Sequence, residues 1–158
     1  MSEWERTGKS NDWHTPKYIF DAMDVIFWND VAAPSGATHV PCLNTTITNS
    51  LAQEWDGFIW MNPPFGGRNE IRPWLEKFFT HGNGVALMPD RTSAPWFQWA
   101  AHRADAVLFL SPKVNFERPD GTIGKSPGSG TALMAAGPAG VQALINARRL
   151  GWLVKNYV

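Results

Sequence analysis

Short apolar runs alternate with helical patterns along the second half of the chain. Four runs have the length of buried strands: GFIWMN, GVALMP, AVLFLS and TALMAAG, at residues 57–62, 84–89, 106–111 and 131–137. Between and after these runs, apolar side chains recur at helical spacing in residues 69–84, 94–104 and 139–150. The alternation predicts an α/β protein with a mostly parallel sheet and helices on both of its faces.

The first half of the chain has a less regular pattern. Thr15 and Pro16 are typical of a helix start, and the apolar residues after them predict a helix at about residues 16–25 and then a strand that ends near Asp30. Residues 34–57 are polar and irregular, and we expect short strands in HVPCLN and TTITNSL. We expect residues 1–12 to be a flexible arm and residues 13–158 to form a single domain.

The stretch FIWMNPPFGG, residues 58–67, ends a predicted strand abruptly. Pro63 and Pro64 have no N–H and a fixed φ, so they stop the strand and keep the backbone stiff. The Asn62 amide oxygen and the Pro63 carbonyl are then two fixed acceptors for the two protons of one –NH₂ group, and Phe65 can lie under a flat ring. Such acceptors stabilise a transition state in which the amine attacks an electrophile.

The acceptor pair by itself is compatible with several substrate amines. Adenine N6 and cytosine N4 both fit, and so do adenine in RNA and the side-chain amide of a protein glutamine. An inactive fold that binds nucleic acid or a protein is the alternative from another class, and a proline-rich turn is the simplest reading. If the sheet is parallel, Asp30, Asn62, Pro89–Asp90 and Ser111 end strands at one edge, where ligands bind.

Composition and charge narrow the class of protein. The 158 residues include 44% hydrophobic residues and carry no net charge, which suits a globular domain without an overall field that attracts nucleic acid. The charge is uneven, because residues 1–56 carry eight acidic and three basic side chains, and residues 101–158 carry seven basic and three acidic ones. The basic end of the chain is therefore a candidate for contacts with phosphates.

Cysteine, histidine and hydropathy patterns exclude other classes. Cys42 is alone, so an internal disulfide or a multi-cysteine metal site is not expected. The four histidines have no ligand spacing, so we expect no metal, although His14 is a candidate for a pocket wall. No apolar run approaches the roughly 18–20 residues of a membrane span, and MSEWERTGKS lacks the apolar core of a signal peptide. We expect a soluble protein of a reducing compartment, with no membrane partner.

Six segments of the chain occur in an order that resembles a known family. These are WHTP (13–16), DVAA (30–33), NSLAQEW (49–55), NPPFG (62–66), PDRTSAPWF (89–97) and KVNF (113–116). Together they resemble the small phage-type DNA N6-adenine methyltransferases, a Dam-like family that uses S-adenosylmethionine. The resemblance implies a Rossmann-like class I methyltransferase fold with six parallel strands and one antiparallel strand. It also implies methyl transfer to a flipped-out adenine of double-stranded DNA.

The same resemblance implies roles for individual residues. Asn62, Pro63, Pro64 and Phe65 match the catalytic tetrapeptide, in which Phe65 replaces the commoner Tyr, and Asp30 matches the acid that pairs with the cofactor's ammonium group. The implied cofactor contacts are Trp13, Thr15, Pro16, Asp30, Ala32, Asn49 and Asn62. The implied substrate contacts are Phe65, Arg91, Trp96 and Phe116. Packing is the alternative role for Trp13 and Phe116, and a turn is the alternative for Asp30 and Asn49.

The chain departs from the broader methyltransferase pattern in two respects. NDVAAPSG stands where a glycine-rich F-x-G-x-G turn is common, and no segment is long enough for a separate target-recognition domain. Loops 34–48 and 112–130 are then expected to recognise the DNA, either with modest specificity or within a homodimer. The resemblance also implies a phage or prophage origin, the cytoplasm of a bacterial host, and a role in evading restriction.

Overall fold

One seven-stranded sheet organises the chain. The computed structural model describes residues 13–65, 70–124 and 128–156, so the arm expected at residues 1–12 and the end of the NPPFGG stretch lie outside the described residues. The strand order is β2-β1-β3-β4-β6-β5-β7. The strands are β1 (Phe27–Asp30), β2 (Cys42–Thr45), β3 (Ile59–Met61), β4 (Gly84–Pro89), β5 (Ala106–Leu110), β6 (Thr131–Ala136) and β7 (Gly151–Lys155).

The predicted α/β class is confirmed, but the sheet is mixed: neighbouring strands pair in parallel from β2 to β4 and antiparallel from β4 to β7. β1 pairs in parallel with β2 and β3, and β3 with β4, whereas β6 is antiparallel to both β4 and β5. Within the described residues a second strand, β7, is also reversed, because it pairs antiparallel with β5 at the edge of the sheet. The sequence analysis did not predict this strand, in which Trp152 and Val154 are exposed.

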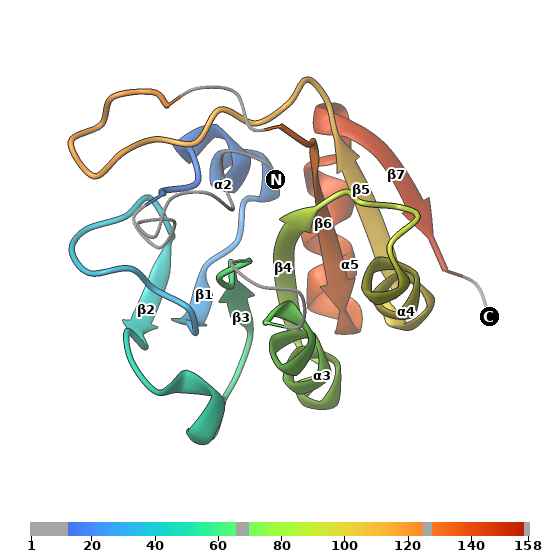
Figure 1. Cartoon of the computed structure of the whole chain (residues 1–158), viewed down its shortest axis with the longest axis horizontal. Helices are drawn as coiled ribbons and strands as arrows, with labels where there is room; N and C mark the ends of the chain where they lie inside the picture. Colours follow the sequence, from blue (N-terminus) through green and yellow to red (C-terminus); the bar gives the residue numbers. More distant parts are fainter. Residues whose placement is uncertain (1–12, 66–69, 125–127, 157–158) are drawn as a thin grey trace.

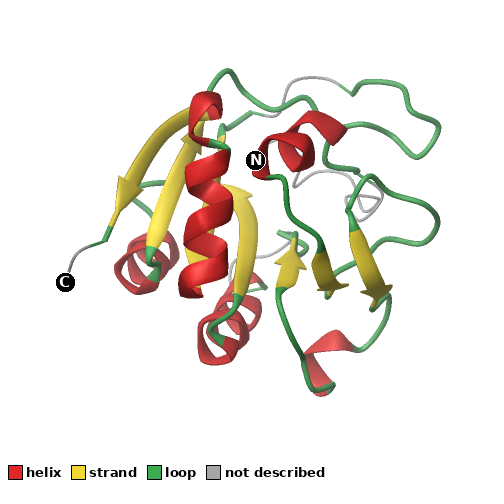
Figure 2. Cartoon of the chain, turned by 180° about the vertical axis from the view of Figure 1, so that it is seen from behind, coloured by secondary structure: helices red, strands yellow, loops and turns green. Residues whose placement is uncertain are grey.

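Helices cover both faces of the sheet. α2 (Lys17–Met23) and α5 (Gly137–Asn146) lie on one face, and α3 (Ile71–His81) and α4 (Pro95–Arg103) lie on the other (Figures 1 and 2). Phe20 of α2 packs edge-to-face on Trp60 of β3, with ring centroids 4.8 Å apart. The Asn146 amide of α5 donates to the Met23 carbonyl of α2 at 2.9 Å, which joins the two helices of that layer.

Two helix boundaries were predicted from individual residues, and the structure confirms one of them. α3 ends at Gly82, whose φ of 75° is left-handed, as the sequence predicted. α2 begins one residue later than expected, with Pro16 at the cap position and no side-chain cap. The prediction that Thr15 caps this helix is wrong, because its hydroxyl instead accepts a hydrogen bond from the Asn62 amide.

The polar segment between β1 and β3 contains β2 and a short 3-10 helix, η2 (Ser50–Ala52). The strand expected in HVPCLN is present in part as β2, but the strand expected in TTITNSL is absent from this described segment. Asn49 has a left-handed backbone, with φ 56° and ψ 29°, and this conformation starts the turn of η2 instead of continuing an extended chain.

The parallel strands β1, β3, β4 and β5 end at the same edge of the sheet. Asp30 pairs with Trp60, and Met61 with Ala86, so Asp30 and Asn62 leave neighbouring strands at nearly the same level. The prediction that Asp30, Asn62, Asp90 and Ser111 share one edge is therefore confirmed. Figure 1 shows the loop after β5 crossing from that strand to the side of α2 and β2.

Candidate active site

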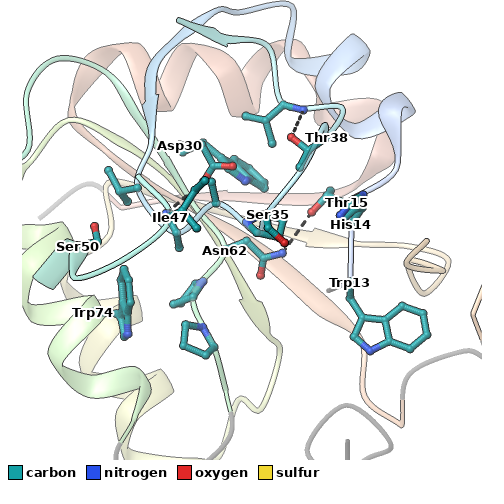
Figure 3. Close-up of a pocket in the computed structure, with 18 of the residues that line it drawn as sticks. Trp13, His14, Thr15, Asp30, Ser35, Thr38, Ile47, Ser50, Asn62 and Trp74 are labelled. Atoms are coloured by element: carbon teal, nitrogen blue, oxygen red, sulfur yellow. Dashed lines mark hydrogen bonds between the residues drawn. The ribbon is translucent and has the colours of Figure 1, made fainter. Parts of the chain in front are cut away.

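A cavity of about 490 Å³ opens at the carboxyl edge of the sheet. Its walls come from the segment before α2, the turn after β1, η2, the end of β3 and one residue of α3 (Figure 3). In this view Asn62 lies between two groups of side chains, with Trp13, His14 and Thr15 on one side and Ser50 and Trp74 on the other. Segments far apart in sequence thus meet around the tip of β3.

The Asn62 amide is held at the floor of this cavity. Its Nδ2 donates to the Thr15 hydroxyl in a long hydrogen bond of 3.4 Å, and this arrangement leaves the Oδ1 acceptor for other groups. Pro63 is buried and Pro64 is half-buried, and both line the cavity. Stiff proline backbone and one amide hydrogen bond therefore present an oxygen acceptor at the end of a central strand.

Asp30 supplies the buried charge of the site. Its side chain is 2% exposed, and its Oδ1 accepts a hydrogen bond from the Ala32 N–H at 3.2 Å. Burial raises the pKa of Asp30 to about 7, and the Ala32 hydrogen bond offsets only part of that rise. Among the described residues no Lys, Arg or His forms an ion pair with it. This carboxylate suits a cationic ligand.

Eight of the thirteen predicted site residues line the cavity, and the other five do not. The eight are Trp13, Thr15, Asp30, Ala32, Asn49, Asn62, Pro63 and Pro64. Phe65 and Phe116 pack in the hydrophobic core and are 8% and 5% exposed. Trp96 is half-buried against Phe97, and Arg91 is exposed in the loop after β4. Pro16, also a predicted cofactor contact, is buried at the start of α2 outside the lining residues.

The cavity also contains residues that the sequence patterns did not identify. Pro34, Ser35, Thr38 and Ile47 come from loop 34–48, which we expected to recognise DNA; here it forms a cavity wall. His14 lines the cavity, as its position within the WHTP segment suggested. Helical spacing placed Trp74 with the inward residues of α3, but only the fold shows that it reaches the cavity beside η2.

The loop after β5 is attached to the segment that begins the cavity wall. The backbones of His14 and Glu117 exchange two hydrogen bonds, of 2.8 and 2.9 Å, and the Glu117 carboxylate accepts from His39 at 2.8 Å. The Arg118 guanidinium lies 5.3 Å from the centre of the Trp13 ring. Loop 112–124 therefore joins the WHTP segment to loop 34–48 at the rim of the cavity.

The described residues contain neither a metal-binding cluster nor a membrane-spanning helix. Across the described ranges, no three His, Cys, Asp or Glu side chains gather in a way that could hold a metal ion. Over the same ranges, no helix has both the length and the apolar composition needed to cross a membrane.

The fold and the site together define an α/β protein with a polar, partly acidic cavity at the carboxyl ends of parallel strands, where nucleotide-like ligands bind in such folds. Residues 5–140 match the family model described as DNA N-6-adenine-methyltransferase (Dam). The chain belongs to this family, and the resemblance inferred from its segments is confirmed. Neither the curated proteins nor the solved structures contain a match to the chain.

Proposed function

We propose that this protein transfers a methyl group from S-adenosylmethionine to N6 of adenine in double-stranded DNA. The observation that carries the proposal is the shared cavity of Asp30 and Asn62, which combines a buried carboxylate for a cation with an amide acceptor for an amine. Family membership supports adenine N6 as the amine. The reversed β6 between β4 and β5 supports assignment to the Rossmann-like class I methyltransferases.

The residues around the cavity fit the cofactor. When bound, S-adenosylmethionine supplies an electrophilic methyl group on a sulfonium centre. The Asp30 carboxylate is placed to pair with the ammonium of the methionine part, which would favour its ionised form. Trp13 and Trp74 supply flat apolar walls, and Thr15, Asn49 and Ser50 supply polar groups.

Asn62 has the catalytic role in this proposal. Its Oδ1 accepts a hydrogen bond from the target amine, and the Pro63 carbonyl accepts the other, so the nitrogen lone pair is directed away from the ring. Asn62 and Pro63 would thus hold the amine while its nitrogen takes the methyl group that the cofactor would supply, the cofactor leaving as its demethylated thioether and the amine giving up one proton to water. The hydrogen bond from Asn62 Nδ2 to Thr15 leaves the Asn62 oxygen free for this role.

The target base must leave the duplex to reach Asn62, at a cost on the order of a few kcal/mol. We assign Phe65 and Phe116 to stacking on this base, and Arg91 and Trp96 to contacts with the DNA. Both phenylalanines are almost fully covered in this structure, so stacking requires that the rings be uncovered. We also assign the enzyme to the cytoplasm of a bacterial host, with a phage or prophage origin, on the basis of the family resemblance.

The test is methyl transfer by an Asn62→Ala variant. With labelled cofactor and duplex DNA, we expect the rate to fall by roughly 10²–10³-fold, while cofactor affinity changes by less than about threefold. Asn44→Ala, an exposed asparagine on β2, is the matched control and should retain full activity. Full activity of Asn62→Ala would contradict the assigned role.

The same assay separates the alternative substrates. Nuclease digestion of the labelled DNA should release N6-methyladenine. Label in N4-methylcytosine, in RNA or in protein would instead identify another amine. Failure of the folded wild-type protein to bind S-adenosylmethionine or its demethylated product would leave an inactive binding fold as the function.

A further inference from the structure

The cavity wall formed by Asn49, Ser50 and Leu51 has little regular structure of its own. It is one turn of 3-10 helix that follows a left-handed Asn49. Only two backbone bonds close this turn, from Ala52 N–H to the Asn49 carbonyl and from Gln53 N–H to the Ser50 carbonyl, both 3.1 Å. Side chains from elsewhere must therefore fix the wall if it is to bind a ligand with specificity.

Trp55 holds the Ser50 side chain in one orientation. The indole Nε1 donates to the Ser50 hydroxyl oxygen at 3.0 Å and to the Ser50 carbonyl at 3.1 Å. Because indole N–H only donates, the Ser50 oxygen acts as acceptor here and keeps its own proton for another partner. Ser50 is 5% exposed and lines the cavity, so an acceptor within the cavity is a suitable partner.

Lys77 fixes the backbone of the same wall. Its ammonium, which extends from α3, donates to the carbonyls of Leu51 at 3.0 Å, of Ser50 at 3.3 Å and of Gln53. It also lies 4.9 Å from the centre of the Trp55 ring. Three donors on one ammonium meet three carbonyls of one turn, which makes Lys77 the main tertiary contact that orders this wall.

We infer that Ser50 donates a hydrogen bond to the purine of the bound cofactor, and that Lys77 and Trp55 are positioning residues that aim it. The inference rests on the proposed function. Asn49, beside Ser50, offers an amide oxygen as acceptor, so the two residues present an acceptor and a donor side by side. A 6-aminopurine has the complementary pair, an amine that donates and a ring nitrogen that accepts. A 6-oxopurine has the reverse pair.

Binding of S-adenosylhomocysteine and of its deaminated analogue, S-inosylhomocysteine, tests this inference by calorimetry. Wild-type protein should bind the adenine compound at least about tenfold more tightly, because the reversed pattern sets the ring N–H of the inosine compound against the hydroxyl donor of the buried Ser50. Ser50→Ala should weaken binding of the adenine compound by roughly tenfold and of the inosine compound by less than threefold. The ratio of the two affinities is the readout that a general loss of folding would not change.

Lys77→Met tests the positioning role without relying on activity. We expect its adenine-to-inosine ratio to fall as in Ser50→Ala, and its amide hydrogens at residues 50–53 to exchange faster than in the wild type. Lys17→Met, which removes an exposed lysine paired with Asp21 at 2.7 Å, is the matched control and should change neither measurement.

The outcomes separate this inference from the proposed function. If the wild type binds neither compound, the proposed function fails and the inference fails with it. If the wild type binds S-adenosylhomocysteine but Ser50→Ala keeps the same ratio, the donor role is overturned and the proposed function stands. An unchanged ratio and unchanged exchange in Lys77→Met would overturn the positioning role alone.

Discussion

Asp30 and Asn62 line the same cavity, but the free-energy cost of burying the two side chains differs. Asn62 is neutral, so its burial requires only that the amide be hydrogen-bonded, and Thr15 provides part of that requirement. Asp30 is ionisable, and burial raises its pKa to about 7, so the protonated form is favoured below that pH. The acid therefore reduces the stability of the protein without ligand near neutral pH.

Replacing Asp30 by Asn should reveal this cost through the pH dependence of stability. The folded-state pKa of Asp30 is raised above its unfolded value, so the wild type loses stability as the pH rises from about 4 to 7. Asp30→Asn has no carboxyl group at this position and should not show this loss of stability. At pH 8 we expect the variant to be more stable by on the order of a few kcal/mol, and at pH 3.5 the two should be equal. Urea unfolding at both pH values measures the difference. An equal stability at pH 8 would contradict the assignment.

At the scale of elements, the close approach of β3 and β4 determines where β3 ends and therefore where Asn62 lies. Gly84 begins β4 beside Ile59, and a Cβ built on Gly84 would lie 2.6 Å from the Ile59 carbonyl oxygen and 3.1 Å from the Phe78 ring of α3. A glycine is needed here because backbone, sheet partner and helix meet without room for a side chain. The same contact fixes the level at which Met61 ends and Asn62 enters the cavity.

Substituting Gly84 by Ala should therefore be strongly destabilising. The Ile59 carbonyl is part of the sheet backbone and cannot move away from an added Cβ. We therefore expect the free energy of unfolding to fall by about 1–3 kcal/mol, the usual range for overpacking. Gly36→Ala is the comparison, since a Cβ there meets nothing within 4 Å and only the left-handed φ of 87° is strained. Thermal unfolding should rank Gly84→Ala as the less stable variant, and the reverse order would contradict this view of the β3–β4 contact.

At the scale of the whole molecule, the fold places three basic residues near the C-terminus at opposite ends of strand β5. Arg148 and Arg149 lie in the 3-10 turn η3 (Arg148–Leu150), whose Leu150 carbonyl accepts from Ser111 at the carboxyl end of β5. Lys155 pairs with Ala106 at the start of β5, at the opposite edge. Although the net charge is zero, basic side chains are thus available at the edge that holds the cavity.

Salt dependence of DNA binding tests this arrangement. Replacing both Arg148 and Arg149 by Ala should weaken binding of a fluorescent duplex and lower the slope of log K against log salt by up to about 2, because each lost phosphate contact contributes about 0.9. Lys155→Ala is the control from the far edge and should leave the slope unchanged. Equal slopes in all three proteins would show that η3 does not contact DNA.

The order of strands and helices from β3 to α5, the abrupt end of β3 and the family were determined by the sequence alone. The reason is that these features depend on local periodicity, on prolines without an N–H and on the order of short segments. Which residues line the cavity was determined by the tertiary structure. Loop 34–48 became its wall, Phe65 and Phe116 were drawn into the core, and Lys77 reached η2 from a helix more than twenty residues away. Which side chains meet across such distances depends on how strands pair and helices pack, and no local pattern encodes that.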